Sequence, residues 1–211
     1  MPWLRPAVWL SASTPALTLA VQAATGGLSA EPVADVLNRL GLTALVLLVG
    51  SLACTPLRVL TGFSALAPIR RTLGLFAFAY ALAHVATYAL VDQGARLGAI
   101  VDDIVKRPFI LFGFLAFVIL AALAITSPLS MVKRIGARRW KLLHRLAYVA
   151  GALAVVHFFL RVKKDVTEPV AYGAVLALLL LVRLAVSLKE RRARQIASAL
   201  GTPPPPPPPR A

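Results

Sequence analysis

Six long apolar segments alternate with short polar ones along the chain. They cover approximately residues 6–24, 41–60, 72–91, 108–127, 142–160 and 169–188. Crossing a hydrocarbon core of ~30 Å takes roughly 20 mostly apolar residues in a helix, and each segment is close to that length. The segments are continuously apolar and lack the alternation of transmembrane β-strands. The pattern predicts an all-α, polytopic membrane protein in which residues 1–200 form a six-helix transmembrane bundle.

The two ends of the chain carry weaker signals. Residues 1–24 resemble a signal peptide, but the apolar run continues past a plausible cleavage point, which favours a retained first helix. Residues 201–211 contain seven consecutive prolines and predict a disordered polyproline tail. A ligand for a proline-binding module is the alternative for this tail.

Composition and charge agree with a membrane protein. The 211 residues are 59% hydrophobic, and the net charge is +15. That charge could indicate nucleic-acid binding, but the basic residues form short clusters between apolar runs, with no basic amphipathic face. Membrane topology explains the clusters better, so we expect lipid and no nucleic acid as a partner.

The clusters alternate between the two sides of the predicted bundle. One side carries almost only basic residues, namely Arg5, Arg58, Arg70, Arg71, Lys133, Arg134, Arg138, Arg139, Lys141, Arg145, Lys189, Arg191, Arg192 and Arg194. On the other side acids and bases balance. The positive-inside rule therefore predicts a multi-pass protein of a bacterial inner membrane with both termini in the cytoplasm.

All three histidines lie within or at the mouth of predicted spans, where ionisable residues are functional candidates. His84 follows Arg71 by 13 residues and His157 follows Arg145 by 12, so both lie ~18–20 Å from the cytoplasmic side. Two neutral imidazoles at one level on two helices are a ligand set for six-coordinate b-type haem. Thr87 and Tyr88 are candidates to hydrogen-bond the His84 ring, although hydroxyls in membrane helices often bond back to their own backbone.

His144 lies ~20 Å closer to the cytoplasm than His157, and in an ideal helix it would point about 140° away. A face shared by the two rings would require a bend between them. Arg70 lies at a depth close to that of His144, where Arg70 and Arg71 could bind a haem propionate. The alternative for both arginines is a topological role, with their side chains reaching the headgroups.

Two other classes of function remain open. Each histidine could hydrogen-bond a neighbouring helix in a structural subunit without a cofactor, or serve as a proton relay in a small transporter. The absence of acidic residues from the six apolar segments, and of paired broken helices, disfavours a transporter.

Several motifs together resemble one known family. They are TPLR at 55–58, RRTLGLFAFAYALAHVATYAL at 70–90, KRPFILFGF at 106–114 and RRWKLLHRLAYVAGALAVVHFF at 138–159. With them, the chain from about Gly26 to Arg183 resembles the MsrQ/YedZ family, the haem-binding membrane subunits of a periplasmic protein-methionine-sulfoxide reductase system. That family belongs to the ferric reductase-like transmembrane superfamily.

The resemblance implies a function and a set of site residues. It implies that His84, His144 and His157 bind haem iron and that Arg70 and Arg71 are the family's double arginine. Larger relatives with two haems have a second histidine near the position of Arg70, which leaves one or two haems here. The resemblance also implies FMN and electron transfer from quinol or a reduced flavin to a periplasmic molybdenum-containing catalytic subunit. The chain itself would carry electrons without further substrate chemistry.

Overall fold

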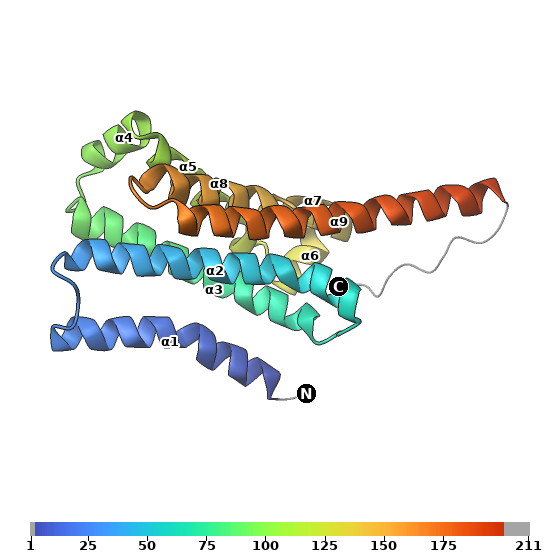
Figure 1. The fold of residues 1–211 in the computed structure, drawn as a ribbon, viewed down its shortest axis with the longest axis horizontal. Coiled ribbons are helices and arrows are strands. Elements are labelled where there is room, and N and C mark those ends of the chain that lie inside the picture. Colours follow the sequence, from blue (N-terminus) through green and yellow to red (C-terminus); the bar gives the residue numbers. More distant parts are fainter. Residues whose placement is uncertain (1–2, 201–211) are drawn as a thin grey trace.

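The computed structural model describes residues 3–200 as an assembly of helices (Figure 1). They are α1 (Leu4–Thr25), α2 (Pro32–Thr61), α3 (Leu66–Ala86), the π-helix η1 (Thr87–Asp92), α4 (Leu97–Lys106), α5 (Pro108–Ile125), α6 (Leu129–Ile135), α7 (Ala137–His144), α8 (Leu146–Arg161) and α9 (Thr167–Ala199). Six segments are long and apolar enough to cross a membrane. The predicted all-α membrane architecture is confirmed, and the polyproline tail lies outside the described residues.

The bundle is built from two helix pairs. α2 packs most extensively on α3, and α5 on α8, while the contacts between the two pairs are fewer. α1 lies beside α2 and α3, and α9 packs against α8 and α2. We use the term basic end for the end of the bundle where α2 stops and α3 begins. The opposite end is where α2 starts and where α4 lies (Figure 1).

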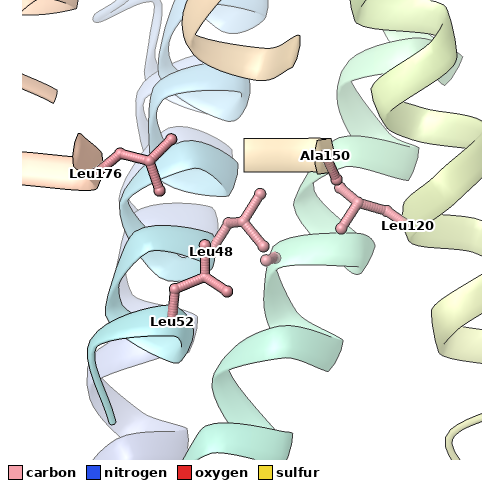
Figure 2. Packing of buried hydrophobic residues seen from close by; sticks show 6 residues of the cluster. Leu48, Leu52, Leu120, Ala150 and Leu176 are labelled. Atoms are coloured by element: carbon pink, nitrogen blue, oxygen red, sulfur yellow. The ribbon is translucent and has the colours of Figure 1, made fainter. Parts of the chain in front are cut away.

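Small residues bring the two pairs together at the centre. Ala77 of α3 and Ala150 of α8 are completely buried, and Leu52 of α2 is 1% exposed. Leu48, Leu120 and Leu176 complete this cluster (Figure 2). Because lipid competes with helices for apolar side chains, close packing around small residues holds membrane helices together better than hydrophobicity does.

Large apolar side chains also cover the outside of the bundle. Leu10 and Leu17 of α1 and Leu178, Leu181 and Leu184 of α9 are all more than half exposed. Contiguous apolar surface of this kind on spanning helices is solvated by lipid chains. The apolar surface therefore supports insertion in a bilayer.

Several helices run beyond the apolar segments that predicted them. α2 begins at Pro32 and not near 41, α3 begins at Leu66, and α9 continues to Ala199. Hydropathy marks only the lipid-facing part, whereas the backbone hydrogen-bond ladder continues into polar sequence. The predicted helix 142–160 is also interrupted: α7 ends at His144 and α8 starts at Leu146.

Tyr80 of α3 ties α1 to the bundle. Its hydroxyl donates to the Ala12 carbonyl (2.7 Å) and accepts from the Ala16 amide (3.0 Å), so it enters the hydrogen-bond ladder of α1. Pro15, which has no amide hydrogen, interrupts the ladder at the same place. The Tyr80 hydroxyl thus pairs with the Ala12 carbonyl and the Ala16 amide beside this interruption.

We expect Tyr80→Phe to lower the free energy of unfolding by about 1–3 kcal/mol, because two backbone groups of α1 lose their partner. Thermal unfolding of the purified protein in detergent measures the change. Tyr172→Phe is the matched control, because that tyrosine contacts the Phe158 ring and its hydroxyl makes no hydrogen bond within the described residues. Equal unfolding temperatures for the two variants would contradict the role of the Tyr80 hydroxyl.

Candidate functional site

His84 and His157 meet inside the bundle near its opposite end. His84 lies near the end of α3 and His157 near the end of α8, so each helix pair contributes one ring. The ring centres are 6.2 Å apart, and the ring planes are nearly perpendicular at 83°. The equal depth expected from the sequence is therefore confirmed, and the two rings lie side by side between the helix pairs, with their planes nearly perpendicular.

The spacing suits a metal ion held between the rings. A metal ion bonded to an imidazole nitrogen at about 2 Å would lie about 3 Å from the ring centre, so two imidazoles that hold one ion would have their centres at most roughly 6 Å apart. The measured 6.2 Å agrees with that value. One metal ion bound by both rings would therefore account for the distance between them.

Both rings are held by the same kind of hydrogen bond. His84 Nδ1 lies 2.9 Å from the Leu37 carbonyl of α2, and His157 Nδ1 lies 2.6 Å from the Phe109 carbonyl of α5. A carbonyl oxygen only accepts, so Nδ1 of each ring carries the hydrogen and donates it. In the neutral ring Nε2 then keeps its lone pair, on the edge turned away from the carbonyl. This is the tautomer of a metal-ligating histidine whose second nitrogen is anchored to the protein.

Two glycines make these bonds geometrically possible. Gly41 follows Leu37 by four residues, and Gly113 follows Phe109 by four. Helical side chains lean toward the preceding turn, so a side chain at either glycine would cover the carbonyl that the histidine uses. A Cβ added at Gly41 would lie 3.2 Å from His84 Nδ1, and one added at Gly113 would lie 2.7 Å from His157 Nδ1. Each ring therefore rests against a bare stretch of helix.

Reasoning from the sequence did not find these two glycines or the two carbonyls. Glycine in an apolar helix indicates close approach of another group, but it does not say which group approaches. In both helices the glycine follows the carbonyl residue by four positions. This spacing can be interpreted as a histidine-binding arrangement only when the helix that carries the histidine is known to pack there. The two helix pairs use the same arrangement, although the sequence around each is different.

His144 is part of a separate cluster at the basic end. Its Nε2 lies 3.2 Å from the hydroxyl of Thr126, the residue that follows α5, and the Trp140 ring stacks on it at 4.0 Å between centres. Trp140 also donates its indole N–H to the Thr126 carbonyl at 2.7 Å. His144 thus has a partner at the end of α5, and it lies far along that helix from the contact of His157 with Phe109.

The interruption at Arg145 lets both histidines of this segment face α5. The Arg145 amide bonds to the Leu142 carbonyl and the Tyr148 amide to the Arg145 carbonyl, each three residues back instead of four. Such tightening changes the phase of the helix between residues 144 and 157. The sequence predicted that a shared face would require a bend, and the structure shows an interruption of the helix between the two histidines.

The predicted arginines occupy different environments at the basic end. Arg70 is half-buried, and its backbone carbonyl accepts a hydrogen bond from the Ser51 hydroxyl of α2 at 2.8 Å. Arg71 is exposed, and its Nε donates to the Ser127 hydroxyl at 3.0 Å. Neither arginine lies near the His84–His157 pair, because the arginines are near the start of α3 and His84 is near its end.

The two hydroxyls near His84 bond elsewhere. Thr87 donates to the Ala83 carbonyl of its own helix at 2.9 Å, and Tyr88 donates to the Asp103 carboxylate at 2.8 Å. The hypothesis that they hold the His84 ring is therefore wrong. The Leu37 carbonyl holds it, because α2 lies against the Nδ1 edge of the ring.

The fold and the histidine pair together define a helical membrane protein that presents two backbone-anchored imidazoles to each other between two helix pairs. Residues 18–155 match the family model described as "Ferric reductase like transmembrane component". Three relatives share the name "Protein-methionine-sulfoxide reductase heme-binding subunit MsrQ". The protein of Rhodospirillum rubrum is 41% identical over 92% of this chain and 93% of its own, that of Ralstonia nicotianae 47% over 84% and 82%, and that of Deinococcus radiodurans 44% over 92% and 96%. The chain belongs to the MsrQ family of ferric reductase-like transmembrane proteins.

Proposed function

We propose that this protein is the electron-transfer membrane subunit of a methionine sulfoxide reductase system and binds b-type haem between His84 and His157. The observation that carries the proposal is the pair of facing imidazoles, 6.2 Å apart, each with Nδ1 hydrogen-bonded to a backbone carbonyl. The names of the relatives add the heme and the reductase system. Haem supplies a one-electron carrier when bound.

The residues of the chain have defined tasks in this proposal. The Leu37 and Phe109 carbonyls fix the tautomer and orientation of the two ligands and make them more basic. Gly41 and Gly113 leave room for the rings. Both ligands are therefore positioned before a metal arrives, which favours fast electron transfer with little rearrangement.

The basic end is the proposed entry for electrons from quinol or a reduced flavin such as FMN. His144, Arg70 and Arg71 lie there, and His144 would ligate or contact a second cofactor. With that cofactor the protein would hold one or two haems. The electron acceptor would be a periplasmic, molybdenum-containing catalytic subunit at the opposite end, so the chain would carry no substrate chemistry beyond electron transfer.

The proposed location is a bacterial inner membrane with both termini in the cytoplasm. Its support is the distribution of charge: the basic clusters gather at one end, while the ion pairs Arg39–Asp35, Lys106–Asp102 and Arg107–Asp103 lie at the opposite end. Positively charged ends of membrane helices stay preferentially in the cytoplasm. The His84–His157 pair then lies nearer the periplasm, on the side of the proposed acceptor.

A transporter that uses the histidines as proton relays is less well supported. A relay needs ring nitrogens that exchange protons with neighbouring titratable groups. His84 and His157 instead donate to backbone carbonyls that do not titrate. Their described hydrogen bonds suit a fixed metal ligand better than a proton carrier.

The proposal is tested by spectroscopy of the purified protein and of its His144→Ala variant. We expect a Soret band from low-spin haem in both proteins, because His144 is remote from the His84–His157 pair. Reduction by a quinol or a reduced flavin should be slower in the variant, since its entry site is altered. Absence of haem from the wild-type protein would overturn the proposed function, and equal reduction rates would remove His144 from the electron path.

A further inference from the structure

Asp103 of α4 is a largely buried carboxylate at the opposite end of the bundle, where α4 lies (Figure 1). Its side chain is 14% exposed, whereas that of its neighbour Asp102 is 65% exposed. Burying a charged group is costly unless hydrogen bonds compensate for the lost water. The electron-transfer role described above gives no task to Asp103, so its partners are the guide to what it does.

Three side chains from three segments donate to this one carboxylate. Oδ2 accepts from the Tyr88 hydroxyl at 2.8 Å and from Gln93 Nε2 at 3.3 Å, and Oδ1 accepts from Arg107 Nε at 3.0 Å. Hydrogen bonds to a charged acceptor are stronger than those between neutral groups. Asp103 therefore links the segments of Tyr88, Gln93 and Arg107 at a single point.

Two of the donors belong to the continuation of the helix that carries His84. Tyr88 lies four residues after His84, in the π-helix η1 into which α3 passes without a break. Gln93 ends η1, and its amide bonds to the Tyr88 carbonyl five residues back. Single π-helical turns are rare and often occur at functional sites. Asp103 thus holds the helix end next to His84.

The third donor belongs to the start of the helix that holds the His157 ring. Arg107 has extended backbone angles (φ −115°, ψ 101°), as a residue before proline prefers, and this separates α4 from α5. Its carbonyl accepts from the Ile110 and Leu111 amides in the first turn of α5. That turn contains Phe109, whose carbonyl bonds to His157. Asp103 thus also holds the turn that anchors the His157 ring.

The chain between η1 and α4 is a tight turn. Gly94 and Ala95 have positive φ angles of 56° and 59°, and this conformation is unfavourable for alanine. Such a turn does not by itself favour the approach of α4 to η1. The three hydrogen bonds to Asp103 offset its cost and connect the two helix pairs where the histidine rings meet.

We propose that Asp103 is a positioning residue for the two candidate haem ligands. By accepting from Tyr88 and Arg107 at the same time, it fixes the distance and the relative orientation of His84 and His157. Asp103 itself would not touch the cofactor. The identity of the bound group rests on the proposed function, whereas the hydrogen bonds at Asp103 do not.

The test compares Asp103→Asn with Asp102→Asn, which is the same chemical change at the exposed neighbouring position. An asparagine at 103 keeps one acceptor oxygen and cannot satisfy all three donors. We expect haem titration of the apoprotein to show about a tenfold loss of affinity in Asp103→Asn, the lower end of the loss when a partner of a metal ligand is removed. Asp102→Asn should bind haem like the wild-type protein, because the partner of Asp102 is Lys106 on the same helix.

Electron paramagnetic resonance of the ferric haem separates positioning from a general loss of stability. The g values of low-spin haem depend on the angle between the two axial imidazole planes, and the planes of His84 and His157 are 83° apart. We expect altered g values in Asp103→Asn and unchanged ones in Asp102→Asn. Wild-type affinity and g values in Asp103→Asn would overturn the positioning role.

Hydrogen–deuterium exchange of the haem-free protein tests the link without a cofactor. Amides of residues 87–92 and 108–113 should exchange faster in Asp103→Asn than in Asp102→Asn, because both segments lose a shared support. Equal exchange in the two variants would overturn the link. Should Asp103→Asn fail to fold, Tyr88→Phe replaces it, with Tyr172→Phe as its control, because that change removes only one hydrogen bond to the carboxylate.

The wild-type protein in the same experiments keeps this inference apart from the proposed function. Absence of haem from the wild-type protein would overturn the proposed function and the positioning role with it. A normal wild-type haem spectrum, with equal affinity and equal g values in Asp103→Asn and Asp102→Asn, would overturn the positioning role alone. Faster exchange without any effect on haem would make Asp103 a residue of structural importance only, which also overturns the positioning role.

Discussion

Replacing His157 or His84 by alanine should abolish the low-spin haem signature of this protein. Each substitution removes one of the two imidazoles whose centres lie 6.2 Å apart, and water is a poor replacement in an apolar site. Loss of residues that merely orient a ligand weakens metal sites by about 10- to 100-fold, so loss of a ligand should exceed that range. Haem per polypeptide and the visible spectrum of the purified variants measure the effect.

Val156→Ala is the control for His157→Ala. Val156 is the exposed neighbour on the same helix, so its truncation tests the effect of a shortened side chain without touching the site. Added imidazole should restore part of the low-spin spectrum to His157→Ala, because the cavity left by the ring accepts a free ligand. Full-intensity low-spin spectra in both histidine variants would rule out the pair as ligands.

Gly113→Ala should reduce haem affinity by roughly 10- to 100-fold although the residue makes no contact with iron in this proposal. The added methyl group would lie 2.7 Å from His157 Nδ1 and 3.0 Å from Cε1. The ring must then move, and it loses its hydrogen bond to the Phe109 carbonyl. Haem titration of the apoprotein measures the affinity, and the redox potential reports the lost hydrogen bond.

Two other glycines turn this experiment into a graded series. Gly41→Ala should have a smaller effect, because the added methyl group would lie 3.2 Å from the His84 ring. Gly98→Ala should have none, since no atom lies within 4 Å of the added methyl group in α4. Wild-type affinity in Gly113→Ala, or an equal loss in all three variants, would show that the glycines do not support the histidines.

The three histidines lie toward the two ends of the bundle. His144 and its neighbours Trp140 and Thr126 lie at the basic end, while His84 and His157 lie toward the opposite end. α5 connects the two, since Thr126 and Phe109 are near its two ends. α5 and the residue that follows it thus provide the hydrogen-bond partners of both histidines of α7 and α8.

The sequence by itself determined the class of fold and the candidate ligands. Six apolar segments suffice to predict six membrane helices, because transfer into lipid depends on composition and length and hardly on neighbouring helices. The equal depth of His84 and His157 also followed from sequence, since the rise per residue of a helix is fixed. Helix boundaries were less accurate, as α2 and α9 show, because hydropathy does not mark where backbone bonding stops.

Only the tertiary structure decided what holds those ligands. The Leu37 and Phe109 carbonyls, the bare surfaces at Gly41 and Gly113, and the hydrogen bonds that meet at Asp103 all depend on which helix packs against which. The sequence pattern contains no such pairing, because in lipid the association of helices depends on close packing of particular small residues and not on overall hydrophobicity. The interruption at Arg145 is a further case: its three-residue hydrogen bonds shift the phase of the helix between His144 and His157, which the regular periodicity of the sequence does not reveal.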